Sequence, residues 1–258
     1  MLLAIDVGNT QTQFGVFDSA GVLISDWRLS THREQTADEL GGHMRSLLQL
    51  EGIDAKAING MVAASVVPPL TAALGAMGER YFGMAPLMVD ARLVDDLPIL
   101  YEPPEAVGAD RIVNAVAARD KYGVPVVVVD FGTATTFDVV NSDGAYLGGV
   151  IATGVGVSAD ALFQRAARLP RVHIAEPEQV IGRDTTSAVQ SGLFYGYAEL
   201  VDGLLRRIIA ELGVTPRVVA TGGWSATIGN ACANVNCIDP LLTLEGLRLI
   251  FERYRPNA

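Results

Sequence analysis

The sequence predicts an α/β protein built from two related domains. The first observation is a pair of similar segments, Leu2–Thr10 (LLAIDVGNT) and Val126–Thr136 (VVVVDFGTATT), each an apolar run followed by Asp-x-Gly and small polar residues. The second is an order of predicted elements (three strands, a helix, a strand and a helix) that occurs twice along the chain. Because each apolar run is typical of a buried strand and lies in a different half, the repeat indicates two domains of one kind.

Predicted elements of the first half follow from hydrophobic periodicity and turn residues. After the first strand, two further strands over 11–18 and 22–29 complete an antiparallel meander. Thr36–Glu39 (TADE) matches a capping box and begins a helix. The remaining predictions are a strand over 60–67, a helix from there to residue 81, a strand over 87–90, a Pro-containing loop over 101–107 and a helix over 110–121.

The second half repeats the pattern. The predicted elements are strands over 124–130, 135–140 and 145–151 with a hairpin turn at 141–144, helices over 156–167 and 185–213, a strand over 217–220 and a closing helix over 241–253. We expect an N-terminal domain of residues 1–121 and a C-terminal domain of residues 122–258, with the closing helix able to pack back on the N-terminal domain. No low-complexity linker separates the halves, so we expect the domains to pack closely around a cleft.

The amino-acid composition limits the kinds of partner and cellular location that we expect. Half of the 258 residues are apolar and the formal net charge is -10, without any Lys/Arg run, which argues against nucleic acid as the main partner. Asp6 interrupts the first apolar stretch and no run approaches the roughly 20 residues of a membrane span, so we expect neither a signal peptide nor a membrane segment. Cys232 and Cys237 lack metal-site spacing and indicate reduced thiols of a cytoplasmic protein.

The two Asp-x-Gly loops suggest a nucleotide site. A phosphate loop needs backbone N–H groups that face the anion, and a carboxylate such as Asp6 can hold Mg²⁺ through water. Asp130 ends a run of four valines, where a carboxylate is costly unless it is solvated, paired or on a cation. Either loop alone also fits an ordinary hairpin, but the two together indicate a nucleotide gripped between two domains.

Gly108–Arg111 (GADR) is a candidate catalytic segment. The Asp110 carboxylate could accept a proton from a substrate hydroxyl, and the Arg111 guanidinium could hold a carboxylate or a phosphate. A helix cap with a solvent-facing Arg explains the same residues equally well. Tyr101 could close over a small substrate or serve as a core aromatic. No P-loop and no dinucleotide-binding G-x-G-x-x-G follows any predicted strand.

Six segments, in order and over nearly the whole chain, resemble the type III pantothenate kinases. They are Asp6–Thr10, Ser65–Pro68, Gly108–Arg111, Asp130–Thr136, Gly148–Ile151 and Thr221–Gly223. The resemblance implies the acetate and sugar kinase, chaperone and actin superfamily. Its fold is two ribonuclease H-like (actin-like ATPase) domains, with mixed sheets flanked by helices and a cleft between the domains. The implied reaction is ATP-dependent phosphorylation of pantothenate to 4'-phosphopantothenate, the first step of coenzyme A biosynthesis.

The resemblance also implies residue roles. Asp110 would be the general base, Asp6 would face Mg²⁺, and Asp130 would hold a monovalent cation, K⁺ or NH₄⁺. The implied ATP contacts are Asp6, Val7, Gly8, Asn9, Thr10, Gln11, Thr12, Gln13 and Thr133. The implied pantothenate contacts are Tyr101, Gly108, Ala109, Asp110, Arg111 and Thr185, the last reaching across a homodimer into the other subunit's site.

Two positions depart from the family pattern. The chain has Thr153-Gly154 where the family usually has Pro-Gly, and Asp184 where it usually has Asn. These departures leave two alternatives open: an ATP-binding relative without catalysis, and a kinase of the same superfamily that acts on another small hydroxylated acid.

Overall fold

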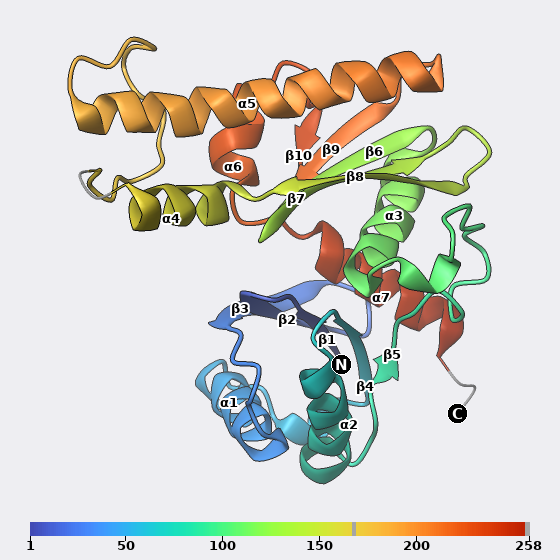
Figure 1. The fold of residues 1–258 in the computed structure, drawn as a ribbon. Coiled ribbons are helices and arrows are strands. Elements are labelled where there is room, and N and C mark those ends of the chain that lie inside the picture. The colour runs from blue at the N-terminus through green and yellow to red at the C-terminus, as the bar shows by residue number, and fades with distance from the viewer. Residues whose placement is uncertain (167–168, 256–258) are drawn as a thin grey trace. The chain divides into compact units, whose positions relative to one another are not determined.

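The computed structural model describes residues 1–166 and 169–255, which form two compact units (Figure 1). The first unit comprises Met1–Ala117 and the described residues from Leu242 onward, and the second is Ala118–Leu241. Each unit contains a mixed five-stranded sheet, and helices pack on both sheets. The predicted α/β class is confirmed. The predicted domain limits, 1–121 and 122–258, stay a prediction.

The sheet of the first unit has the strand order β3-β2-β1-β4-β5. Its strands are β1 (Leu2–Val7), β2 (Gln11–Phe17), β3 (Leu23–Ser30), β4 (Gly60–Ser65) and β5 (Leu87–Met88). The first three form the predicted antiparallel meander, and β4 and β5 add parallel strands beside β1. The β1 strand is therefore central, which explains why its sequence is an almost unbroken apolar run.

Helices of the first unit cover both sides of β1. On one side Leu3 and Ile5 join the core that α1 (Ala37–Leu50) and α2 (Pro68–Phe82) complete. On the other, α7 (Leu242–Tyr254) packs against β1, β2 and β4. Gly15 and Gly60 leave room for it, because a Cβ at either position would lie under 3.0 Å from Leu244 or Phe251. The predicted capping box at Thr36 begins α1.

The sheet of the second unit repeats this topology in the order β10-β9-β6-β7-β8. Its strands are β6 (Val126–Phe131), β7 (Ala134–Val140), β8 (Tyr146–Thr153), β9 (Arg217–Thr221) and β10 (Cys237–Ile238). The antiparallel strands β6, β7 and β8 correspond to β1, β2 and β3, and β9 pairs parallel to β6 as β4 pairs to β1. The predicted duplication is thus present at the level of strand pairing.

The helices of the second unit pack on one face of its sheet. They are α4 (Val155–Arg165), α5 (Thr185–Leu212) and α6 (Ser225–Ile228), and their apolar residues share a core with Val127, Val129 and Phe137. The predicted helix over 156–167 corresponds to α4, with residue 167 outside the described range. Periodicity in the sequence does not predict α6, β10 or the 3₁₀ turns η1 (Ala55–Ala57), η2 (Pro104–Ala106) and η3 (Gly229–Ala231). All of these are short, so periodicity carries little signal for them.

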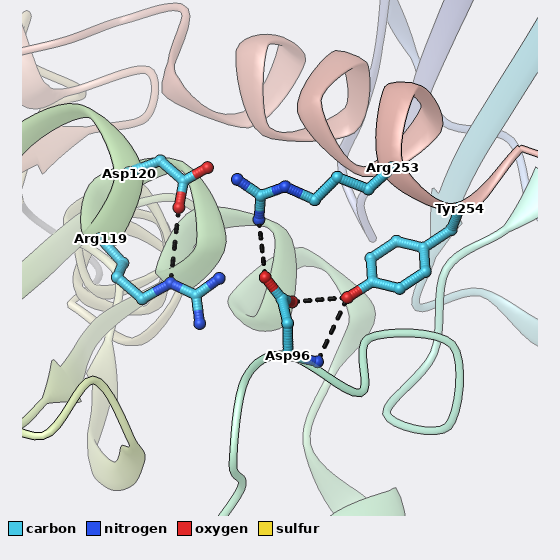
Figure 2. Close-up of polar contacts among 5 residues, drawn as sticks. All are labelled: Asp96, Arg119, Asp120, Arg253 and Tyr254. Carbon is cyan, nitrogen blue, oxygen red and sulfur yellow. Dashed lines mark hydrogen bonds and ion pairs between the residues drawn. The ribbon is translucent and has the colours of Figure 1, made fainter.

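The end of α7 is fixed within the first unit by a carboxylate. Asp96 accepts hydrogen bonds from Arg253 Nη1 (3.0 Å) and from the Tyr254 hydroxyl (2.6 Å), and Figure 2 shows both side chains directed at it. Burial and the bond to Asp96 raise the pKa of Tyr254 to about 12.

No helix within residues 1–166 and 169–255 combines the length and apolar character needed to cross a membrane.

Candidate active site

The β1–β2 turn presents the first predicted loop. Gly8 N donates to Gln11 O (3.0 Å), and a Cβ on Gly8 would lie 3.0 Å from the same oxygen, so the turn is tight. Asp6 is half-buried at the end of β1, while Asn9, Thr10 and Gln11 are exposed. Backbone and side-chain donors of this turn are therefore open to a ligand.

The remaining residues of this loop are less accessible. The side chains of Val7 and Thr12 are buried, so Val7 can offer a ligand only its backbone. The buried Gln13 Nε2 donates to no group in the described part of the chain. An amide donor left in this state is costly unless a ligand or water accepts from it. Gln13 therefore fits a loop that binds a polar molecule.

Asp110 lies in the first turn of α3 (Ala109–Tyr122). Its Oδ1 accepts a hydrogen bond from Arg111 N (2.8 Å), and a Cβ on Gly108 would lie 2.5 Å from that oxygen. Burial raises the pKa of Asp110, and the Arg111 N–H and guanidinium offset this only in part. A carboxyl with a raised pKa is a better proton acceptor than an ordinary Asp, as a general base requires.

A cavity of about 500 Å³ in the first unit lies against Gly108 and Ala109. This volume is typical of small-molecule sites. Its lining residues come from the end of β4, the segment after β5 and the turn before α3: Ser65, Val66, Val89, Asp90, Ala91, Arg92, Glu105, Ala106, Val107, Gly108 and Ala109. The segment Val89–Arg92 was missed from the sequence, because a two-residue strand followed by a loop gives no periodic signal.

Four predicted substrate residues are not part of this lining: Tyr101, Asp110, Arg111 and Thr185. Tyr101 lies half-buried ahead of η2, and the Arg111 side chain is only 8% exposed. The structure therefore places Gly108 and Ala109 in the cavity lining, with the Asp110 carboxylate beside Gly108. The places of Tyr101, Asp110 and Arg111 relative to a bound substrate stay a prediction.

In the second unit, two glycines lie beside the Asp130 carboxylate. Gly222 has φ +88°, and a Cβ there would lie 2.4 Å from Asp130 Oδ1. A Cβ on Gly132 would lie 3.6 Å from the same oxygen. Neither glycine places a Cβ beside this carboxylate at a strand end, and carboxylate oxygens are suitable ligands for hard cations. The residues present therefore fit the monovalent cation that the resemblance implies.

Thr133 lies at the exposed tip of the β6–β7 turn, the counterpart of the β1–β2 turn. Gly154 N donates to Thr133 O (3.1 Å), and a Cβ on Gly154 would lie 2.3 Å from that oxygen. The Tyr197 hydroxyl on α5 donates to the carbonyl oxygen of Thr153 (3.1 Å) and contacts Ser158 Oγ. The family usually has Pro-Gly at this point. In this chain the segment is Thr153-Gly154, and Tyr197 holds it through a hydrogen bond to its backbone.

Thr185 is the first residue of α5, and Asp184 caps that helix. Asp184 Oδ1 accepts from Ser187 N (3.0 Å), and these hydrogen bonds lower the pKa of Asp184. The unusual Asp is thus an N-cap, a role that Asp and Asn fill about equally well.

Over the described ranges, no group of three or more His, Cys, Asp and Glu side chains could hold a metal ion.

Comparison with known proteins shows the family of this chain. The family model for type III pantothenate kinase matches residues 2–207. The chain belongs to the type III pantothenate kinase family. A type III pantothenate kinase of Koribacter versatilis is 50% identical over 267 residues, which cover 100% of this chain and 97% of that protein. A type III pantothenate kinase of Myxococcus xanthus is 49% identical, with 98% of each chain covered.

Solved structures of low sequence identity share the fold. A putative Baf family transcriptional activator from Campylobacter jejuni has a TM-score of 0.59 at 20% identity, covering 97% of this chain and 98% of that one. The ADPNP-bound activator of 2-hydroxyisocaproyl-CoA dehydratase from Clostridium difficile has a TM-score of 0.58 at 12% identity, covering 98% and 95%. As a type III pantothenate kinase family member, the chain is a kinase, and the reaction of its family is ATP-dependent phosphorylation of pantothenate.

Proposed function

We propose that this chain transfers the γ-phosphoryl group of ATP to the hydroxyl of pantothenate, with Asp110 as the general base. The observation that carries the assignment is the Asp110 carboxylate, which lies against Gly108, a residue that lines a cavity of about 500 Å³. Burial raises its pKa. Pantothenate is a small, polar molecule for which such a cavity is large enough.

In the proposed reaction, a bond forms between the substrate oxygen and the γ-phosphorus while the bond from that phosphorus to the bridging oxygen of ADP breaks. The hydroxyl proton passes to an Asp110 oxygen. In such transfers the protein mainly positions the groups and stabilises charge, so the base is needed late. Asp110 lies in the first turn of α3, where the helix dipole favours its charged form and so opposes the effect of burial.

The ATP phosphates would be bound by Asp6–Gln13 in the first unit and by Thr133 in the second. The tight Gly8 turn and the exposed side chains of Asn9 and Thr10 support this assignment. Asp6 would hold Mg²⁺ through water, and Asp130 would hold K⁺ or NH₄⁺. When bound, these cations offset the negative charge of the phosphates.

The proposed pantothenate contacts are Tyr101, Gly108–Arg111 and Thr185. We place Thr185 in the site of the other subunit of a homodimer, because its helix start is exposed in the single chain. We also propose that the enzyme acts in the cytoplasm and has no nucleic-acid partner. Its net charge of -10 supports the latter, since polyanions require clustered Lys and Arg.

A substrate panel tests this function. Purified protein with ATP, Mg²⁺ and K⁺ is offered pantothenate and other small hydroxylated acids, and the products are identified by mass spectrometry. We expect one phosphate added to pantothenate and much slower reaction with the others. Preferred phosphorylation of a different acid would support a related kinase, and nucleotide binding without any product would support a non-catalytic relative.

A further inference from the structure

The connection between β3 and α1, residues 31–36, is attached to the β1–β2 turn. Thr31 N donates to Thr10 O (2.9 Å), and the hydroxyls of Thr31 and the buried Thr12 lie 2.9 Å apart. At its other end, Thr36 forms the capping box of α1 with Glu39. The connection is therefore fixed at both ends and short enough that a residue in its middle has a defined place.

Arg33 is that residue, and its side chain reaches the proposed phosphate loop. Arg33 Nη2 donates to Asn9 Oδ1 (3.1 Å), and the side chain is exposed. A guanidinium carries five N–H donors in a rigid plane. The bond to one amide oxygen uses one of them and orients the plane, so the others are available to an anion that enters the loop.

A positive charge at this position would balance the negative charge of phosphate groups bound at the loop. Asp6–Gln13 supplies backbone N–H groups, amides and hydroxyls, but its one ionised side chain is the carboxylate of Asp6. A nucleoside triphosphate carries several negative charges, and the chain itself has a net charge of -10. Arg contacts to phosphate are charge-assisted and frequently bidentate, so they are among the stronger hydrogen bonds that a protein makes.

We propose that Arg33 binds the terminal phosphate groups of the nucleotide held by the Asp6–Gln13 loop. This role rests on the proposed function, which places ATP at that loop, and it adds a residue from outside the family's motifs. The Asn9 amide then has two tasks: it lies in the loop, and it orients the Arg33 guanidinium before the nucleotide arrives.

Calorimetric titration with adenosine, ADP and a non-hydrolysable ATP analogue tests this role. Arg33→Gln should weaken binding of the ATP analogue about 10-fold to 100-fold, the range for one charge-assisted hydrogen bond. Affinity for adenosine should be unchanged, because adenosine has no phosphate. Arg33→Lys should restore part of the affinity through its charge. Arg45→Gln is the matched control, since Arg45 is an exposed arginine on α1.

Two results would overturn the role of Arg33: wild-type affinity of Arg33→Gln for the ATP analogue, or an equal loss for adenosine and the analogue. Thermal unfolding of both Gln variants should match wild type, since both side chains are exposed. If the wild-type protein binds none of the three ligands, the proposed function fails and the role of Arg33 fails with it. The two failures are therefore distinguishable.

Discussion

At the scale of single residues, Asp110 carries both the proposed chemistry and a cost in stability. Burial raises its pKa, so its charged form is less favourable in the folded protein than in the unfolded chain. A carboxyl of this kind destabilises the fold once the pH rises above its unfolded pKa of about 3.9. Function commonly retains such a residue at the expense of stability.

Asp110→Asn should therefore lower kcat by about 100-fold or more, the scale of a lost general base, while leaving the fold intact. At neutral pH the variant should unfold at a Tm equal to or above that of wild type, and this difference should disappear as the pH falls below the unfolded pKa. In wild type, kcat/KM should fall as the pH decreases through the raised pKa. A kcat of Asp110→Asn close to that of wild type would show that Asp110 is not the general base.

Gly222 provides a second residue-scale prediction. Gly222→Ala would place a Cβ 2.4 Å from Asp130 Oδ1 and would strain a backbone with φ +88°, so the carboxylate must move. We expect activation by K⁺ to weaken at least several-fold, measured as the K⁺ concentration for half-maximal activity. Gly223→Ala is the control, because its Cβ would have no heavy atom within 4 Å. Equal behaviour of the two variants would contradict the cation role of Asp130.

At the scale of secondary-structure elements, the start of α4 is tied to the β6–β7 turn. Gly154→Ala would bring a Cβ to 2.3 Å from Thr133 O and 2.5 Å from Gly132 O, which forces the turn away from the helix. We expect a several-fold rise in KM for ATP with a smaller change in KM for pantothenate. Gly156→Ala, whose Cβ would make an ordinary contact with Trp224 at 3.6 Å, should leave both constants unchanged. An unchanged KM for ATP in Gly154→Ala would contradict the ATP contact proposed for Thr133.

How far the sequence predicts each element depends on its length and its contacts. The buried strands β1 and β6 and the cap of α1 could be predicted, because apolar runs and a capping box are local signals. The short strand β10 and the cavity residues Val89–Arg92 could not, because tertiary packing places them. Asp184 stands where the family usually has Asn, and its hydrogen bond from Ser187 N shows that it is a helix cap, which only coordinates reveal.

On the scale of the whole molecule, one topology occurs twice, and we propose that its two copies have different roles. Both sheets begin with an antiparallel meander whose first turn carries Asp-x-Gly, and both add a parallel strand beside the first. The first unit also contains Asp110 and a cavity lined in part by Ser65 and Gly108. In the second, glycines surround the Asp130 carboxylate. In the proposed function, the duplication would supply two phosphate or cation loops, and the base would come from α3, which follows the first unit's sheet in sequence.

The most direct test of the central claim is the rate of ADP release, measured with and without pantothenate in K⁺ buffer and again in Na⁺ buffer. The account predicts rapid release only when pantothenate and K⁺ are both present, with one 4'-phosphopantothenate formed per ADP. ADP release that is independent of pantothenate, or full activity in Na⁺ alone, would contradict it.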